Sequence, residues 1–540
     1  ARAPVPRQTL LEAFLSTTTR SPADGNEERL LDPATPNLAR ILERAGYTTY
    51  LKGKWHLTKP IAGEWAQPDS DAMARDFGIH GWEPPDAGEN TDPDGFGGGT
   101  AGSSKEGFDE DYTRQAERFL AAADLPEPFC LIVSLVNPHD VLGYPSSYAA
   151  GGYRREEFAG LPVGLPATID ENLRDKPTAH AMLKLGQTSY LGALRTRAEQ
   201  LDYVRFYAHL HTLVDAKIGR LLAALGDPDD PRSLRARTVV TRFSDHGEMG
   251  LSHGGLRQKM FNAYEETIRV PMIWSNPVLY PTAQTTDALV SHVDLLPTLC
   301  ALTGVPGWQS KGFAGVDYSS IVLNPAAASV QDYILFTFDD IYAASNAATF
   351  PTGPVSPPNR IRMIRTSDFK YARYFDADGV AADQQEFYDL RPLGGDFSAL
   401  YGLPLEEKNI SIWAEALRTL NSEPTLATPT QQAARTLLMN QLATLEGTRL
   451  ATRAYTSSVA PEKMKFEIKR WTDPTNGPQA KVQLTFNSRI NTTYQLQKST
   501  DLVSWSNIGT TLAGNNGPVL MSDTLGGQKA FYRVQWTQAS

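Results

Sequence analysis

Apolar segments of strand length alternate with helix-like segments through the first 300 residues, and three of these strands run directly into polar turns. They are GYTTYLKGKWHL (46–57), PFCLIVSLVNPHD (128–140) and RTVVTRFSDHGE (237–248). This alternation predicts an α/β fold with a mainly parallel sheet flanked by helices on both faces. In such sheets ligands bind beyond the carboxyl ends of the strands, so we expect the three polar turns to gather at one patch.

The first of these units shows how a helix is expected to lead into its strand. Thr35 is placed to cap the helix, Pro36 suits its first position, and Gly46 follows the last apolar residue and ends it. A longer amphipathic helix is predicted over residues 201–227, immediately before the third strand. The Gly- and Asp-rich stretch between residues 83 and 107 predicts a loop.

Two changes of pattern divide the rest of the chain. Residues 1–328 are expected to form the α/β domain, and residues 329–462, with strands joined by turns and one helix near residue 435, a small α+β subdomain. Residues 463–540 contain short alternating strands separated by Asn, Gly and Asp turns, which predicts an appended all-β sandwich. This last module could serve as a spacer, an adhesion module or a carbohydrate binder.

Composition excludes several classes of protein. The net charge of −10 is spread along all 540 residues, so no nucleic-acid footprint is present. No apolar run reaches the roughly 18 residues of a transmembrane segment, and the first residues show no signal-peptide pattern. Cys130 and Cys300 lie in apolar surroundings that indicate packing rather than a disulfide or zinc site. Oligomeric state is not predicted.

Asp245 and His246 stand side by side where the third strand ends. A carboxylate oxygen and an imidazole nitrogen facing one cavity are half of a divalent-metal site, although a helix-capping aspartate beside a surface histidine is an equally good interpretation. Lys54, His139 and Lys259 occupy similar turns. Each lysine alone suits a solvated surface, but several basic groups near a metal make sense where an anion binds.

On these residues the chain resembles the sulfatases, metal-dependent ester hydrolases of the alkaline phosphatase-like superfamily. GYTTYLKGKWHL is similar to the family's second signature, NPHD to its substrate-histidine turn, and SDHGEMG with LRQKMFNAYEETIRVPMI to its metal and second-lysine segment. SHVDLLPTLCALTGVP, IRTSDFKYARYF and EFYDL resemble later landmarks. The resemblance covers residues 1 to about 450 in the expected order.

The resemblance implies a role for each of these residues. Asp245 and His246 would bind calcium or another hard divalent cation, and Lys54 and Lys259 would neutralise the sulfate oxygens. His139 would contact the leaving-group side, and His56 would orient or assist the nucleophile. The substrate would be a small-molecule or glycan sulfate ester, and the location periplasmic or extracellular.

The resemblance weakens at the amino terminus. Sulfatases use a formylglycine made from a cysteine or serine in a Cys/Ser-x-Pro-x-Arg turn, and the segment in register here places Ala3, Val5 and Arg7 at the nucleophile, proline and arginine positions. Alanine cannot become formylglycine, and the family's Asp-Asp metal strand has no counterpart in this sequence. Turnover is therefore expected to be impaired.

Three functions remain open on the sequence alone. The first is a sulfuric ester hydrolase acting on aryl or carbohydrate sulfates. The second is a phosphate or phosphonate ester hydrolase on the same scaffold, because the basic groups would serve either anion. The third is a non-catalytic protein whose cationic pocket holds sulfated glycans.

Overall fold

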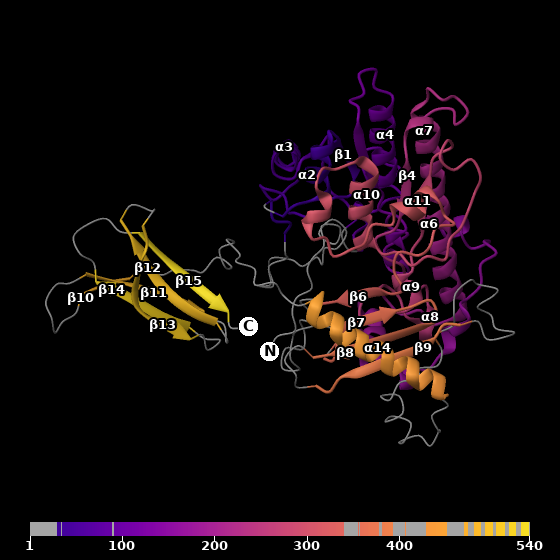
Figure 1. Cartoon of the computed structure of the whole chain (residues 1–540). Helices are drawn as coiled ribbons and strands as arrows, with labels where there is room; N and C mark the ends of the chain where they lie inside the picture. The colour runs from indigo at the N-terminus through magenta and orange to yellow at the C-terminus, as the bar shows by residue number, and fades with distance from the viewer. Residues whose placement is uncertain are drawn as a thin grey trace. The chain divides into compact units, whose positions relative to one another are not determined.

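The chain divides into two compact units, residues 2–451 and 452–540. A computed structural model describes the first unit at residues 30–33, 35–88, 91–339, 355, 357–376, 381–391, 406 and 428–450. It describes the second at residues 469–472, 480–487, 492–500, 504–513, 518–524 and 531–538. Figure 1 shows both units with their labelled elements.

A three-stranded parallel sheet carries the first two of the predicted polar turns. Its strands are β1 (Thr48–Gly53), β2 (Ile79–His80) and β3 (Phe129–Ser134), in the order β2-β1-β3. Thr48 pairs with Phe129 and Gly53 with Ser134, so β1 and β3 end level with each other. The turns after β1 and β3 therefore begin at the same edge of the sheet, as the sequence predicts.

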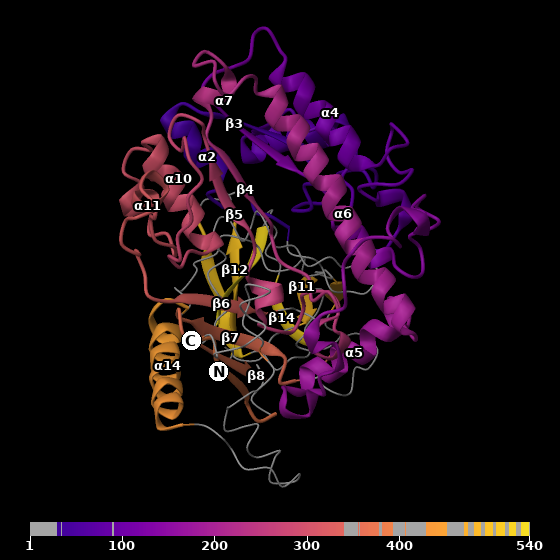
Figure 2. The ribbon, with the colours of Figure 1, turned by 90° about the vertical axis from the view of Figure 1, so that its right-hand side faces the viewer.

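Helices cover both faces of this sheet. On one face, α4 (Phe108–Leu120) packs its Phe119 ring 4.6 Å from the ring of Tyr50. On the other, α2 (Leu38–Leu42) and α10 (Leu295–Thr303) share an apolar cluster with Ile132 of β3. The long helix α6 (Arg197–Ala224) runs beside α4 (Figure 2), and Arg220 of α6 binds Glu110 and Glu117 of α4.

The predicted parallel sheet is present, but it carries only two of the three polar turns, and the third follows a strand of a separate sheet. Strand β4 (Val240–Phe243) pairs antiparallel with β5 (Met272–Ser275). In the described part of the chain no ladder joins β4 to β3, although Arg237 before β4 pairs with Glu127 before β3 at 2.7 Å. The intervening segment 244–271 returns the chain in the opposite direction, which the local sequence pattern does not reveal.

A four-stranded antiparallel sheet completes the first unit. Its order is β6-β7-β8-β9, with bounds Ile334–Phe338, Arg360–Arg365, Phe369–Phe375 and Gln384–Asp389. Leu438 and Leu442 of α14 (Pro429–Thr448) cover one face. The other face packs against residues between Met249 and Tyr264, so this sheet supports the segment that carries Lys259.

The predicted caps and ends of the helices hold only in part. Gly46 ends the first helical segment with φ 85°, as predicted. Thr35 does not cap it, because the Asn37 side chain accepts the hydrogen bond from the Arg40 amide and the helix starts at Leu38. The other α-helices of the described residues are α3 (Gln67–Ala72), α5 (Thr178–Tyr190), α7 (Leu234–Arg237), α8 (Ser252–Gly255), α9 (Glu265–Ile268) and α11 (Ser319–Leu323).

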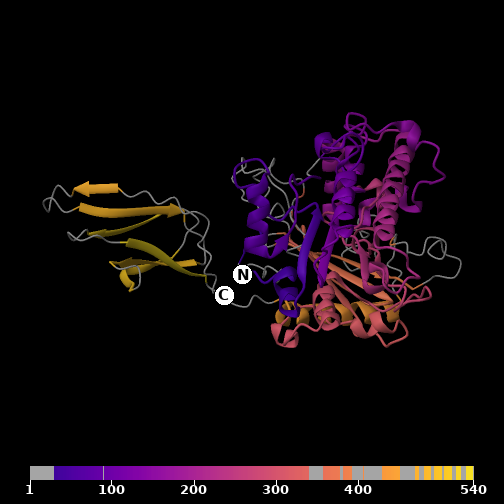
Figure 3. The same ribbon diagram turned by 90° about the horizontal axis from the view of Figure 1, so that it is seen from above.

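The described residues of the second unit form two three-stranded antiparallel sheets, whose strands lie one above the other in Figure 3. One sheet has the order β10-β11-β14, with bounds Lys469–Thr472, Ala480–Asn487 and Pro518–Thr524. The other has the order β13-β12-β15, with bounds Ser506–Ala513, Thr492–Ser499 and Phe531–Gln538. Lys498 of β12 pairs with Asp523 of β14 at 2.7 Å. Across the described residues, no helix is both long and apolar enough to cross a bilayer.

Candidate active site

The turn after β1 holds Lys54 and His56 in a fixed conformation. The Lys54 amide donates to the Ser134 carbonyl, and its ammonium donates to the Gly88 carbonyl at 2.8 Å. His56 has φ 53°, a left-handed conformation that costs an ordinary residue roughly 1–2 kcal/mol. The Asp86 carboxylate accepts hydrogen bonds from the Trp55 and His56 amides at 2.8 and 2.6 Å, which stabilises this turn.

The turn after β3 presents His139, the first residue of a short 3₁₀ helix (His139–Gly143). The buried Asp109 carboxylate accepts the amides of Val136 and Asn137 at 2.6 and 3.1 Å and so fixes the backbone before His139. Burial lowers the pKa of His139 well below its ordinary value, and Lys54 and Lys259 lower it further. His139 is therefore neutral at pH 7.

Asp245 and His246 face each other in the turn after β4. Nδ1 of His246 lies 2.8 Å from the Gly247 carbonyl, which can only accept, so Nδ1 carries the hydrogen. Nε2 then directs a lone pair toward Oδ2 of Asp245, 3.2 Å away. Desolvation and Lys259 lower the pKa of His246 to about 4, against the opposing effect of Asp245. Two lone pairs facing each other at this distance suit a shared cation.

Lys259 follows a second left-handed residue, Gln258, at φ 66°. Both oxygens of Glu248 accept the Gln258 amide, at 3.0 and 2.9 Å. Desolvation lowers the pKa of Lys259, while Asp245 and Glu248 oppose that shift.

The structure brings six of the seven site residues of the sequence analysis within electrostatic range of one another. His139 interacts with Lys54, His56, His246 and Lys259. Asp245 interacts with His246, Lys259 and Lys54, which together lower the pKa of its carboxyl against the effect of desolvation. The seventh, Arg7, lies outside the described residues, as does Ala3. Segments distant in sequence thus bring two lysines, three histidines and one aspartate near one another.

The donors of this site fit a hard cation in kind but not in number. Asp245 offers carboxylate oxygens, and the Nε2 of His246 is unprotonated and directed at the same point. A calcium ion takes about six to eight ligands, mostly oxygens. These two residues could therefore hold part of the coordination shell of a divalent cation.

Three residues near the site were not identified from the sequence. Asp86 and Glu248 hold the turns described above, and His292 interacts electrostatically with Asp245. Glu248 stands three residues after Asp245, and His292 lies inside the landmark SHVDLLPTL, so the motif context was an available signal for both. Asp86 lies in the stretch predicted to be a loop, where nothing in the sequence singles it out.

A buried ion cluster behind the site is an alternative place for a metal. His253, Glu266 and Glu406 bring ligand atoms within 4.8 Å of one another. However, Nδ1 of His253 lies 2.6 Å from Glu171 and its Nε2 lies 3.4 Å from Glu266. Burial opposes protonation of the ring, but these ion pairs outweigh it and raise the pKa of His253 to about 9. In the absence of a metal these contacts make the cluster an ion pair network, and a cation bound there would have to displace the ring protons of His253.

This network predicts a loss of stability in alkaline solution. Because the pKa of folded His253 lies above the value of about 6.5 for an unfolded histidine, its contribution is complete below pH 6.5 and disappears as pH rises through 9. The full effect is on the order of 3 kcal/mol. Urea unfolding from pH 6 to 9.5 should show this decline in the wild type and a flatter profile in His253→Gln. The exposed His211, replaced by Gln, is the control and should keep the wild-type profile.

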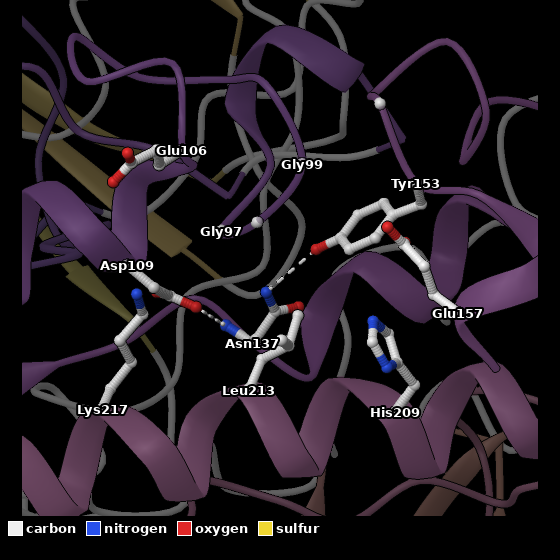
Figure 4. A pocket seen from close by; sticks show the side chains of 12 residues that line it. Gly97, Gly99, Glu106, Asp109, Asn137, Tyr153, Glu157, His209, Leu213 and Lys217 are labelled. Carbon is white, nitrogen blue, oxygen red and sulfur yellow. Dashed lines mark hydrogen bonds between the residues drawn. The ribbon is translucent and has the colours of Figure 1, made fainter. Parts of the chain in front are cut away.

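A polar pocket of about 290 Å³ lies between the 97–99 loop and α6 (Figure 4). Its wall includes Asp109, Asn137 and Tyr153, and it contains none of the predicted site residues. Figure 4 shows that Asn137 bonds to both Asp109 and Tyr153. These groups hold the turn that leads to His139, so we assign the pocket a supporting role.

Comparison with known proteins places this arrangement in a family. Arylsulfatase K of Gallus gallus is 27% identical over 49% of this chain and 47% of its own length. The Delta 4,5-hexuronate-2-O-sulfatase of Bacteroides thetaiotaomicron is 25% identical over 50% of this chain and 52% of its own. The chain thus spans about half the length of the curated relatives it matches.

Solved structures share the fold. A protein in complex with its substrate D-glucosamine-2-N,6-O-disulfate superposes with a TM-score of 0.53 at 18% identity, over 83% of this chain and 90% of that one. The sequence model of the sulfatase family matches residues 8–305, which is more than half of the chain. The fold is the alkaline phosphatase-like α/β fold, and the protein belongs to the sulfatase family.

Proposed function

We propose that this protein is a sulfuric ester hydrolase that acts on aryl or carbohydrate sulfate esters at the site formed by the three turns. The observation that carries the proposal is the convergence of Lys54, Lys259 and His139 on the Asp245–His246 pair. A sulfate ester is an anion whose oxygens gain charge as the ester bond breaks, and positive groups fixed around them stabilise that charge.

Each residue has a role in the proposed reaction that follows from its position in the site. Lys54 and Lys259 neutralise the oxygens of the sulfate, and the neutral His139 forms a hydrogen bond on the leaving-group side. His56, held beside Lys54, orients the nucleophile. Asp245 and His246 hold part of the shell of a calcium or similar cation, which when bound would withdraw charge from the sulfate oxygens. The family resemblance makes Arg7 a further candidate for this reaction.

The rate of sulfate ester hydrolysis depends on the nucleophile. With Ala3 at the formylglycine position, we expect binding of sulfate esters but little hydrolysis, because removing the nucleophile of an enzyme can lower its rate on the order of a million-fold. This expectation leaves room for a second function, a binding protein for sulfated glycans. The periplasm or the cell exterior is the location we propose for either function.

The test compares binding with turnover. A sulfated monosaccharide is titrated calorimetrically with and without Ca²⁺, and matched aryl sulfate and aryl phosphate esters are assayed for hydrolysis. We expect binding that Ca²⁺ strengthens, and slow hydrolysis that favours the sulfate. Preference for the phosphate would support a phosphate or phosphonate hydrolase, and binding with no hydrolysis above the uncatalysed rate would support the glycan-binding function. If the protein neither binds the sulfated monosaccharide nor hydrolyses either ester, the proposal is contradicted.

A further inference from the structure

Two carboxylates stand beside a site that has to attract an anion. Asp86 interacts electrostatically with Lys54 and His56, and Glu248 interacts with Lys259. Their charges oppose the binding of sulfate, because a negative group near the lysines repels the ligand that the lysines attract. Electrostatic attraction therefore does not explain why they lie there.

The backbone contacts of Asp86 offer an explanation. One carboxylate oxygen accepts the amides of Trp55 and Ala87, at 2.8 and 3.1 Å, and the other accepts the amide of left-handed His56 at 2.6 Å. Gly88, two residues further on, accepts from the Lys54 ammonium. One short loop thus holds both the backbone and the charged end of the Lys54–His56 turn.

Glu248 makes an equivalent set of contacts at the other lysine. Its carboxylate receives the amide of left-handed Gln258, the hydroxyl of Tyr203 at 2.6 Å and the amide of Gly250 at 3.3 Å. Gln258 directly precedes Lys259, so its conformation sets where the lysine side chain begins. Without an acceptor the amide would be left unsatisfied and the turn would relax.

We propose that Asp86 and Glu248 are positioning residues of the sulfate site, each holding a left-handed turn so that the adjoining lysine and histidine point at the bound anion. This inference rests on the proposed function. The two carboxylates weaken anion binding by their charge and strengthen it by holding the lysines and His56 in position. The two effects have opposite signs, which makes them separable.

The experiment titrates inorganic sulfate into the wild type and into Asp86→Asn and Glu248→Gln. Each amide removes the charge and replaces one acceptor oxygen by an NH₂ group that faces a backbone amide. If positioning dominates, we expect sulfate affinity to fall about 10- to 100-fold, by analogy with residues that hold metal ligands in place. If the carboxylates act only through their charge, affinity rises, and the proposal is overturned.

Asp69→Asn is the matched control. Asp69 is buried and accepts two backbone amides, from Ile61 and Ala66 at 2.7 and 2.8 Å, but it holds no site turn. We expect it to lower thermal stability and leave sulfate affinity unchanged. An equal loss of affinity in Asp69→Asn would show a general structural effect and contradict the proposal.

A second readout separates this proposal from the proposed function. A wild type that binds no sulfate would contradict the function, and positioning would then be decided by amide hydrogen exchange. The amide of residue 55 or 56 that faces the new NH₂ group should exchange at least about 10-fold faster in Asp86→Asn, because it loses its acceptor, and the amide of residue 258 should exchange faster in Glu248→Gln, because it loses one of its two acceptors. Unchanged exchange at these amides would overturn the positioning role.

Discussion

Replacing Lys259 by methionine is expected to weaken the binding of inorganic sulfate by at least about 30-fold, since truncating one partner of a desolvated charge pair costs about 2 kcal/mol or more. Methionine keeps most of the apolar length of the side chain and removes only the charge. Of the two lysines near Asp245, Lys259 lowers the pKa of that carboxyl more than Lys54 does, so its loss also removes part of the stabilisation of the aspartate charge. Calorimetric titration at pH 7 measures the change.

The control for this substitution is Lys184→Met, which makes the same change in net charge at an exposed position of α5. It should leave the sulfate affinity within about twofold of the wild type, because the charge of an exposed lysine is screened by water and salt. An NMR titration of the histidine rings gives a check that does not depend on sulfate. Because Lys259 lowers the pKa of both His139 and His246, its removal should raise both, and unchanged values would contradict the arrangement.

The sequence predicts which residues follow a strand where the signal is local. A strand reads as an apolar run and its polar turn follows directly, so Lys54, His139 and Asp245 could each be placed at a strand end. Parallel pairing of β1 with β3 then brings two of the turns to one edge. The sequence pattern identifies the residues at the end of each strand, and the packing of the strands brings these residues together.

The sequence does not predict which carboxylates support those turns. Asp86 lies 30 residues from the His56 amide that it accepts, within a loop whose Gly and Asp content indicates only irregular backbone. Its importance comes from its burial beside the backbone amides of a distant turn, and burial depends on how segments far apart in the sequence pack. The antiparallel return of β5 is hidden for the same reason, since a short apolar run carries no direction.

Gly53→Ala is expected to have the largest effect on folding, about 2 to 5 kcal/mol, because strain of a left-handed residue and overpacking add at one position. Gly53 has φ +123°, and a Cβ there would lie 2.1 Å from the carbonyl oxygen of Ser134. The backbone cannot simply move aside. Gly53 pairs with Ser134 in the β1–β3 ladder, and the Lys54 amide donates to that same oxygen.

Comparison with Gly46→Ala separates the effect of the steric clash at Gly53 from that of the backbone strain. Gly46 also has a positive φ, of +85°, but a Cβ there would meet no atom within 4 Å. Gly46→Ala should lower the free energy of unfolding by only about 1 to 2 kcal/mol, which is the cost of the left-handed conformation alone. Urea unfolding of both variants measures the difference, and equal losses would contradict a close approach of β1 to β3. Because Lys54 follows Gly53 directly, the shift that relieves the clash should also displace the ammonium. Sulfate affinity should therefore fall in Gly53→Ala and persist in Gly46→Ala. This result would show that the packing of β1 against β3 sets the position of the Lys54 ammonium.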